Sequence, residues 1–174
     1  STCATVLAID ISHSMILYGE DRITPAKKVA LALTELILTR YPKDSLDVIT
    51  FGDEAAQIDL EDIPYIHVGP FHTNTKEALQ LARQILRKRR NQNKQVFMIT
   101  DGKPSCIREE GRLYKNSFGL DRKIVNQTLN EAAQCKKDNI VISTFMIADD
   151  PYLTRFVDTL TKTNKGRAFY AGLN

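Results

Sequence analysis

The sequence contains little cysteine, and its cysteines form no recognisable pattern. Cys3, Cys106 and Cys135 are odd in number, and no two of them stand in a C-x-x-C arrangement. A small disulfide-bonded scaffold and a zinc ribbon are therefore both disfavoured. Reduced thiols are typical of cytosolic proteins, so this composition favours a cytoplasmic location.

Long hydrophobic runs are also missing. The longest apolar stretch, residues 29–38, is interrupted by Thr34 and Glu35, whereas a membrane-spanning helix needs about 20 apolar residues. No charged segment followed by an apolar one precedes the first predicted strand, so no signal peptide is recognised. We expect no membrane contact. Because the sequence begins at Ser1 rather than methionine, we expect it to be processed, tagged or excised from a longer chain.

A large excess of one charge is absent. The 24 basic and 21 acidic residues give a net charge of +3, whereas nucleic-acid-binding domains usually carry a stronger, clustered basic excess. One basic group does occur, at Arg83, Arg87, Lys88, Arg89, Arg90 and Lys94. It falls at the end of a predicted helix, where basic side chains interact favourably with the helix dipole, and no aromatic residues alternate with it to stack on bases. We expect no nucleic-acid partner.

The composition is that of one globular domain. The chain has 174 residues, of which 43% are hydrophobic and 26% charged, and a chain of this length buries enough surface for its own core. There is no internal repeat, linker or low-complexity tract. We therefore predict a single domain over residues 1–174.

Two periodicities alternate along the chain. Apolar runs typical of buried strands occupy residues 4–10, 46–51, 55–60, 95–100, 140–148 and 167–171. Apolar residues at helical spacing predict helices from Thr24–Pro25 to Tyr41 and over 74–90, 122–137 and 151–163, with residues 61–72 as a loop. Thr24 is predicted to cap the first helix, whose apolar stripe comprises Ala26, Val29, Ala30, Leu33, Leu36 and Ile37.

This alternation predicts an α/β fold with three layers. A mainly parallel six-stranded sheet should carry helices on both faces. The short connection at Gly52–Asp53 predicts a hairpin, so the strand at 55–60 should be a short antiparallel strand at the edge of the sheet. Binding sites of open α/β sheets lie at the carboxyl ends of their strands. The residues that follow those strands are therefore the first candidates for function.

Oxygen-bearing side chains occur at three such places. Asp10, Ser12 and Ser14 follow the first strand, Thr73 precedes the second long helix, and Asp101 follows the fourth strand. In an extended backbone the D-x-S-x-S alternation points its three side chains the same way. Two carboxylates and several hydroxyls are ligands suited to a hard divalent cation such as Mg²⁺.

Each of these motifs also has a simpler interpretation. Ser12 or Ser14 would serve in a turn, Thr73 and Asn74 are good helix caps, and Asp–Gly is a common turn pair. Their joint occurrence at three correctly ordered ends of elements favours a metal site.

The same residues resemble the von Willebrand factor type A (vWA) domain and its metal-ion-dependent adhesion site. The family's D-x-S-x-S matches Asp10, Ser12 and Ser14, its distal threonine matches Thr73, and its T-D-G aspartate matches Asp101. The resemblance extends over essentially the whole chain and implies a Rossmann-like fold. Phe71–His72 stands where many members have glycines, which leaves Thr75 as a weaker candidate for the threonine ligand.

Two further stretches resemble a narrower group within this family. Residues 144–151 (TFMIADDP) and 164–170 (NKGRAFY) are similar to bacterial and archaeal cytoplasmic members that form the C-terminal part of longer proteins. Such proteins often work with AAA+ ATPases. The resemblance therefore implies a cytoplasmic module in a larger assembly, with an AAA+ ATPase as a candidate partner.

The resemblance implies a protein–protein interaction module rather than an enzyme. One divalent cation, Mg²⁺ before Mn²⁺ or Ca²⁺, would bind an Asp or Glu carboxylate of a protein partner. The alternative is a metal-dependent hydrolase or phosphotransferase with Asp10 as its nucleophile. Phosphatases of the haloacid-dehalogenase type need a second aspartate where this chain has Ser12, and the P-loop, G-x-G-x-x-G and G-x-S-x-G motifs are absent.

A long polar segment without clear period follows the third motif. Residues 103–121 are predicted to form a loop beside the metal. Five of its side chains are of types that anchor or steer partners: Arg108, Arg112, Tyr114, Lys115 and Phe118. We predict that they contribute to partner binding, the alternative being a mobile surface loop.

Overall fold

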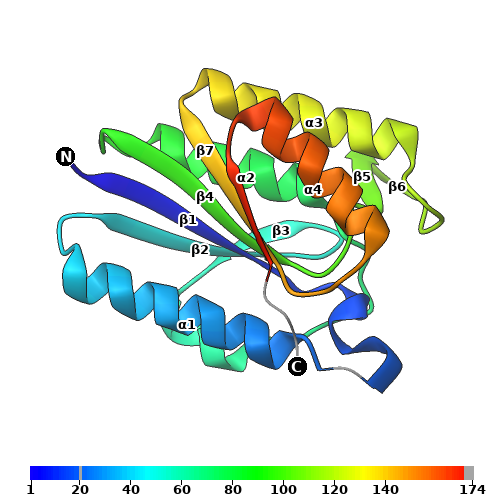
Figure 1. The fold of residues 1–174 in the computed structure, drawn as a ribbon, viewed down its shortest axis with the longest axis horizontal. Coiled ribbons are helices and arrows are strands. Elements are labelled where there is room, and N and C mark those ends of the chain that lie inside the picture. Colours follow the sequence, from blue (N-terminus) through cyan, green and yellow to red (C-terminus); the bar gives the residue numbers. More distant parts are fainter. Residues whose placement is uncertain (20, 171–174) are drawn as a thin grey trace.

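A six-stranded sheet between two layers of helices forms the centre of the molecule (Figure 1). The computed structural model describes residues 1–19 and 21–170. The strands are β1 (Cys3–Asp10), β2 (Ser45–Phe51), β3 (Ala55–Ile58), β4 (Asn93–Thr100), β7 (Ile140–Met146) and β8 (Arg167–Tyr170). Their order is β3-β2-β1-β4-β7-β8, and β2–β3 is the antiparallel pair of a sheet whose other neighbours are parallel.

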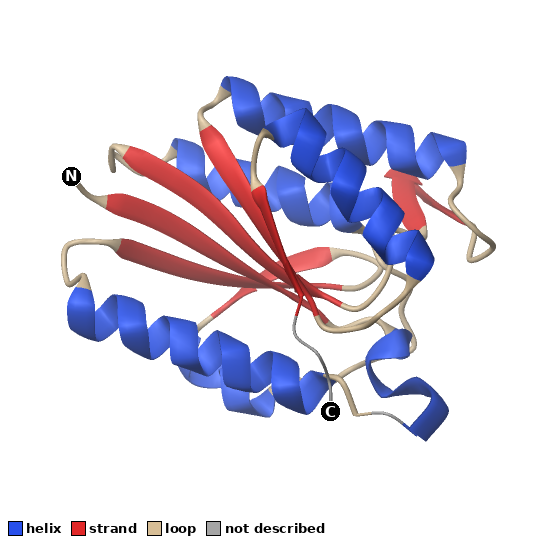
Figure 2. Cartoon of the chain, in the orientation of Figure 1, coloured by secondary structure: helices blue, strands red, loops and turns tan. Residues whose placement is uncertain are grey.

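Helices cover both faces of this sheet (Figure 2). α1 (Ile23–Arg40) and the short 3₁₀ helix η2 (Leu60–Tyr65) lie on one face, and α2 (Thr75–Arg87), α3 (Arg122–Lys137) and α4 (Pro151–Asn164) lie on the other. Each face has its own buried cluster. One contains apolar residues of α2, α3 and α4, and the other contains those of α1 and η2. The predicted three-layer α/β fold, with a short antiparallel edge strand, is confirmed.

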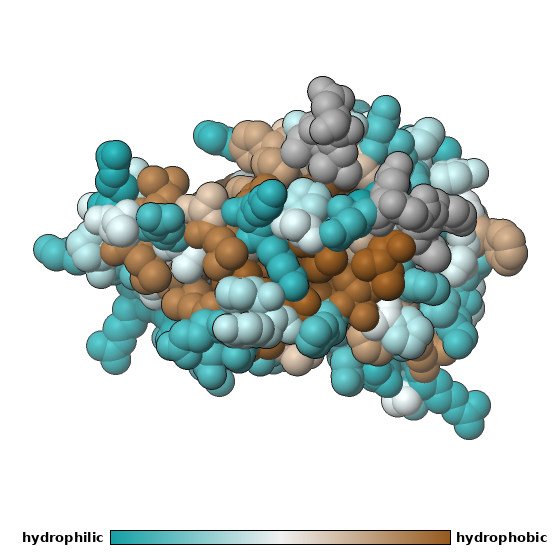
Figure 3. Space-filling view, turned by 90° about the horizontal axis from the view of Figure 1, so that it is seen from below, coloured by the Kyte–Doolittle hydropathy of each residue, from teal (hydrophilic) through white to brown (hydrophobic). Residues whose placement is uncertain are grey.

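The first helix departs from its predicted amphipathic pattern. Its buried residues are Ala26, Ala30, Thr34 and Ile37. Leu36, predicted to face the core, is 48% exposed, and Leu31 and Leu38 on the outer side are also exposed. Figure 3 shows this face from below, with hydrophobic residues gathered among hydrophilic ones. Apolar residues occur around the whole helix, so periodicity alone could not select the buried side.

The predicted cap of α1 is also wrong. The N-cap position is Arg22, whose side chain makes no capping hydrogen bond, and the Thr24 backbone N–H in the first turn donates to Asp21 Oδ1 at 3.0 Å. Thr24 itself lies inside α1. Aspartate and threonine are both good caps, and their order in the sequence does not distinguish them.

Two predicted loops contain regular structure. The segment 61–72 includes most of η2, and the segment 103–121 includes an antiparallel hairpin of β5 (Cys106–Glu109) and β6 (Arg112–Lys115). Glu110 and Gly111, at the turn, have φ values of 48° and 78°, as a tight hairpin turn requires. Strands of four residues are too short to show a clear alternation, which is why the sequence pattern missed them.

The strand order places a switch point beside β1. The chain runs from β1 outward to β2 and β3, then returns to place β4 on the other side of β1. Ile9 is in register with Ile99, so Asp10 and Thr100 end neighbouring parallel strands. In open α/β sheets this is where ligands bind. Among the described residues, no helix combines the length and apolar character that crossing a membrane requires.

Candidate metal centre

The segment after β1 turns sharply and directs two serine hydroxyls into the same region. The Ser12 backbone N–H donates to Asp10 Oδ1 at 2.8 Å, an arrangement typical of an aspartate that starts a turn. The 3₁₀ helix η1 (His13–Gly19) begins immediately afterwards. The Ser12 and Ser14 hydroxyl oxygens consequently lie 3.2 Å apart.

Asp101 connects the end of β4 to this turn. The Ser14 hydroxyl donates to Asp101 Oδ1 at 2.9 Å, although the two residues are 87 positions apart. Arg22 Nη1 donates to Asp101 Oδ2 at 2.8 Å. The Asp101 side chain is fully buried, and the Arg22 side chain is 21% exposed. Both oxygens of this carboxylate thus have defined partners.

Thr73 is held in place by its backbone. Its N–H donates to the Ser105 hydroxyl at 2.9 Å, and its carbonyl oxygen accepts the Ser105 N–H at 2.9 Å. Asn74 caps α2 by accepting the Glu77 N–H at 3.0 Å, so the Thr73 hydroxyl is not needed as a cap. A methyl group added at Gly102 would lie 3.6 Å from Ser14 Oγ and 4.0 Å from Thr73 Oγ1. Both hydroxyls therefore face the residue that follows Asp101.

One cavity joins these groups. Its volume is about 510 Å³, and four of the five predicted ligands line it: Ser12, Ser14, Thr73 and Asp101. Asp10 is fully buried at the end of β1, where it is held by the Ser12 amide. The structure thus brings together all five residues from three separate segments. Thr75, the weaker candidate, lies in the first turn of α2 and is buried.

The electrostatics of the site are governed by two buried carboxylates. Burial raises the pKa of Asp10 to about 7, and the charge of Asp101 adds to this increase. Hydrogen bonds from Ser12 and Thr100 act in the opposite direction, including one from Thr100 Oγ1 to Asp10 Oδ2 at 2.7 Å. A buried carboxylate whose proton affinity is raised by a second carboxylate nearby is the electrostatic setting that a divalent cation would relieve.

The chemistry of the donor set fits a hard cation. In the described part of the chain, no group of three His, Cys, Asp or Glu side chains is placed to hold a metal ion. The available donors are two carboxylates and three hydroxyls, and such oxygen donors suit Mg²⁺, Mn²⁺ or Ca²⁺ better than zinc.

Sequence reasoning missed three residues that support this cluster. Thr100 belongs to the T-D-G motif without being a predicted ligand, yet its hydroxyl donates to Asp10 Oδ2. Ser105 fixes Thr73, and Arg22 pairs with Asp101. The strand register could have indicated Thr100, because it ends the strand beside Asp10. The sequence carried no signal for Arg22 or Ser105, because their partners are distant along the chain.

The predicted partner-binding residues lie around the β5–β6 hairpin. None of the five lines the cavity just described, whereas Lys103, Ser105, Ser117 and Gly119 of the same segment do. Arg108 lines a neighbouring cavity, Tyr114 donates to Asp121 Oδ2 at 2.8 Å, and Phe118 is 89% exposed. Arg112 and Lys115 are exposed on β6.

Part of the basic group at the end of α2 forms ion pairs within the fold. Arg83 pairs with Glu131 at 2.8 Å and with Asp138 at 3.5 Å. Arg89 pairs with Asp47 at 2.6 Å. These contacts join α2 to α3 and to β2.

Comparison with known proteins finds bacterial relatives that match nearly the whole chain. The Rv0959 protein of Mycobacterium tuberculosis is 28% identical over 177 residues, which cover 98% of this chain and 26% of that protein. The Mb0984 protein of Mycobacterium bovis matches with the same identity and coverage. The chain thus spans about a quarter of the length of these bacterial relatives.

Solved structures share the fold at low sequence identity. The SpRpn10 VWA domain superposes with a TM-score of 0.71 at 18% identity, covering 97% of this chain and 87% of that one. The vWF domain of the type V pili tip protein Mfa5 from Porphyromonas gingivalis gives 0.75 at 14% identity, covering 97% and 89%. A family model described as "Rv0959-like protein, vWA domain" matches residues 3–174. The chain therefore belongs to the Rv0959-like vWA domain family, whose fold commonly serves protein–protein interaction.

Proposed function

We propose that this domain is a divalent-cation-dependent protein–protein interaction module. Asp10, Ser12, Ser14, Thr73 and Asp101 would hold the cation, with Mg²⁺ as the first candidate. The observation that carries the proposal is the meeting of two buried carboxylates and three hydroxyls from three segments at the switch point of the sheet. When bound, the cation supplies a positive centre for an Asp or Glu carboxylate of a protein partner.

The residues of the chain have distinct roles in this proposal. Asp10 and Asp101 supply the negative charge, and their burial excludes water that would weaken the attraction. The hydroxyls of Ser12, Ser14 and Thr73 offer neutral oxygens, so the site keeps a net affinity for one more anionic ligand. Thr100 and Ser105 act as positioning residues for Asp10 and Thr73.

The setting of the module is proposed from resemblance alone. Residues 144–151 and 164–170 are similar to cytoplasmic members that work in longer proteins, often beside AAA+ ATPases. We propose the same setting for this domain. The chain matches about a quarter of the length of its relatives, which is consistent with a module of a larger protein.

Direct hydrolysis or phosphotransfer is less well supported. Asp10, the candidate nucleophile, is fully buried, and its two carboxylate oxygens accept hydrogen bonds from the Ser12 amide and the Thr100 hydroxyl. A nucleophile has to reach its substrate. The partner-binding role requires no such access to Asp10.

A thermal melt with and without metal tests the proposal. Metal-stripped protein should be stabilised by Mg²⁺, Mn²⁺ or Ca²⁺ by about 2.7 kcal/mol at 100 times the dissociation constant. For a domain of this size that is a rise in melting temperature of about 5–10 °C. Asp101→Asn should abolish the rise, because it removes one of the two charges that attract the cation.

A matched variant controls for nonspecific ion effects. Asp158→Asn removes an exposed carboxylate on α4 that pairs with Lys162, and it should leave the metal-dependent rise intact. If no ion changes the melting temperature of the wild-type protein, or if Asp101→Asn responds like the wild type, the cation-dependent function is wrong.

A further inference from the structure

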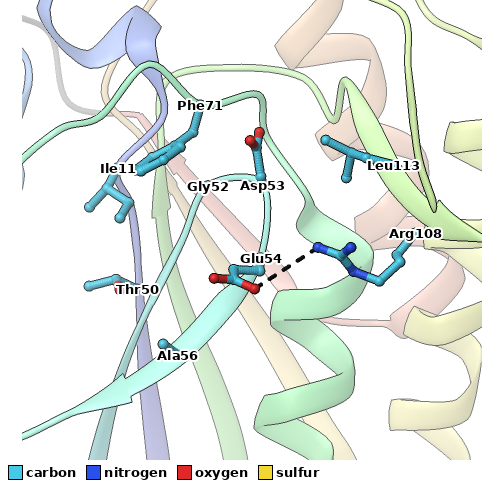
Figure 4. A pocket seen from close by; sticks show the side chains of 9 residues that line it. All are labelled: Ile11, Thr50, Gly52, Asp53, Glu54, Ala56, Phe71, Arg108 and Leu113. Carbon is cyan, nitrogen blue, oxygen red and sulfur yellow. Dashed lines mark ion pairs between the residues drawn. The ribbon is translucent and has the colours of Figure 1, made fainter. Parts of the chain in front are cut away.

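A second cavity lies directly beside the candidate metal centre. It has a volume of about 400 Å³ and shares Phe71 with the first cavity. Ile11, between Asp10 and Ser12, contributes to one wall, and Arg108 and Leu113 of the β5–β6 hairpin contribute to the opposite wall (Figure 4). We call this cavity the Phe71 pocket. Its wall includes Ile11 and Phe71, which lie in or next to two of the three segments that carry the proposed metal ligands.

The aromatic ring of Phe71 packs closely against the backbone of two glycines. A methyl group added at Gly69 would lie 2.1 Å from the ring, and one added at Gly52 would lie 2.7 Å from it. Such distances are not tolerated, so any larger residue at either position would displace the ring. Phe71 is nevertheless 36% exposed. The ring is therefore a fixed apolar surface that remains open to a ligand.

Backbone hydrogen bonds join the segment that contains Phe71 to the turn of the metal centre. The His13 N–H donates to the Phe71 carbonyl oxygen at 3.0 Å, and the Gly69 N–H donates to the Ile11 carbonyl oxygen at 3.2 Å. The backbone of Phe71 is thus held beside the turn that carries Ser12 and Ser14. Because Phe71 also lines the cavity of the metal centre, a ligand in that cavity lies close to it.

The pocket combines this apolar surface with an excess of negative charge. Asp53 and Glu54 line it together with one cation, Arg108. Arg108 lies 4.0 Å from Glu54 Oε2 and 3.9 Å from Glu77 Oε1, so its charge is divided between two carboxylates. Asp53 Oδ1 accepts the His72 N–H at 2.7 Å. Figure 4 shows the Asp53 carboxylate near Phe71 and the Glu54 carboxylate facing Arg108.

We propose that the Phe71 pocket binds a lysine or arginine side chain of the protein partner. The aliphatic stem would pack on Phe71 and Ile11, and the charged end would lie beside Asp53 and Glu54. A cation near an aromatic face gains a further attraction. An acidic side chain would meet two carboxylates, and a purely apolar one would desolvate them without compensation.

This inference rests on the proposed function and specifies its partner. The two cavities share a wall, so one short segment of the partner would occupy both, placing an acidic residue on the cation and a basic residue in the Phe71 pocket. The partner is thus recognised by a pair of opposite charges close together in its sequence or structure.

A peptide array tests in one experiment the binding of an acidic residue to the cation and of a basic residue to the Phe71 pocket. The array carries peptides with a fixed central aspartate and three randomised positions on either side, and the full chain is applied with Mg²⁺ or with EDTA. Binding that requires Mg²⁺ should favour peptides with Lys or Arg near the aspartate. The double variant Asp53→Asn/Glu54→Gln should lower this basic preference by about tenfold, while Mg²⁺-dependent binding of the aspartate remains.

The matched control removes two carboxylates that lie outside the Phe71 pocket. Glu61→Gln/Asp62→Asn removes two carboxylates of η2 that lie outside the pocket lining, and it should retain the basic preference. Mg²⁺-dependent binding without a basic preference would overturn the inference and leave the proposed function standing. A complete lack of Mg²⁺-dependent binding would count against the proposed function instead.

A second measurement examines the pocket without metal. Methyl-labelled protein is titrated with N-acetyl-arginine amide and, in parallel, with N-acetyl-norleucine amide. The arginine probe should shift the methyl resonances of Ile11 and Leu113 more than the norleucine probe does, and Phe71→Ala should reduce the shift. Equal effects of the two probes, or no effect of either, would overturn the assignment of a cationic ligand to this pocket.

Discussion

At the scale of single residues, Arg22 is the unexpected member of the candidate site. Its guanidinium donates to the same carboxylate that was predicted to bind the cation, at 2.8 Å from Asp101 Oδ2. Arg22 therefore neutralises a buried charge from within the chain. A divalent cation bound at the proposed position would act on the same carboxylate, so Arg22 and the cation are two sources of compensation for Asp101.

This shared role predicts the behaviour of Arg22→Gln. The metal-free variant should be less stable than the wild type by about 2 kcal/mol, because a buried carboxylate loses a charged hydrogen-bond donor. Mg²⁺ should then restore part of this loss, so the rise in melting temperature on adding Mg²⁺ should be larger in the variant. Melts of metal-stripped and Mg²⁺-loaded samples measure both quantities.

Arg40→Gln is the control, because Arg40 lies exposed in the last turn of α1, the helix that begins directly after Arg22. It should show the wild-type response to Mg²⁺. If the Mg²⁺-dependent rise in melting temperature of Arg22→Gln is equal to or smaller than that of the wild type, Arg22 and the cation do not both offset the charge of Asp101.

The predictability of the site also differs from residue to residue. Asp10, Thr73 and Asp101 could be found because each stands at the end of a strand or the start of a helix, where the topology brings ends together. Arg22 is 79 positions from Asp101 and Ser105 is 32 positions from Thr73. Such contacts depend on the final packing of side chains, for which a single sequence has no periodic signal.

At the scale of elements, Asp121 joins the hairpin to the helix that follows it. Its carboxylate caps α3 by accepting the Ile124 N–H at 3.0 Å, and it also accepts hydrogen bonds from Asn116 Nδ2 at 3.0 Å and the Tyr114 hydroxyl at 2.8 Å. These hydrogen bonds lower the pKa of Asp121 from 3.8 to about 2. The ionised form is therefore the one that holds β6 to α3.

This lowered pKa predicts a pH-dependent effect of Asp121→Ala. At neutral pH the variant should lose about 1 kcal/mol of unfolding free energy, a typical cost of removing a helix cap. A carboxyl group with a lowered pKa stabilises the fold fully above its ordinary value, and this stabilisation is lost as the pH falls through the folded-state value. The difference between wild type and variant should therefore narrow between about pH 4 and pH 2.

Urea denaturation at several pH values measures this difference. Asp158→Ala provides the comparison, because its exposed pair with Lys162 contributes little. A gap between wild type and Asp121→Ala that stays constant down to pH 2 would contradict the role given to the ionised carboxylate.

The elements themselves were predictable to different degrees. α4 was found with its start at Pro151, and Asp150 accepts the Tyr152 and Leu153 N–H groups as a cap should. The β5–β6 hairpin was missed, because each strand spans four residues and shows little alternation. The burial of α1 was only partly predicted, because Leu36, which was expected to face the core, is exposed.

At the scale of the whole molecule, the candidate centre depends on the order of the strands. The segments after β1, before α2 and after β4 are far apart in sequence, yet they meet because β1 and β4 are neighbours in the sheet. A ligand that binds all three segments stabilises the folded state as a unit. The alternation of strands and helices along the sequence predicts this meeting of the segments.

This arrangement predicts how Mg²⁺ changes the rates of amide hydrogen exchange. If the cation joins the three segments, exchange should slow together at residues 11–15, 73–74 and 101–102, by up to about 100-fold at 100 times the dissociation constant. The β5–β6 turn at Glu110–Gly111 serves as the internal control, because it lies outside the lining of both cavities. Protection confined to one segment would show that the cation, if bound there, does not use ligands from all three. Slower exchange in all three segments that disappears in Asp101→Asn would show that the cation binds where the strand order brings these segments together.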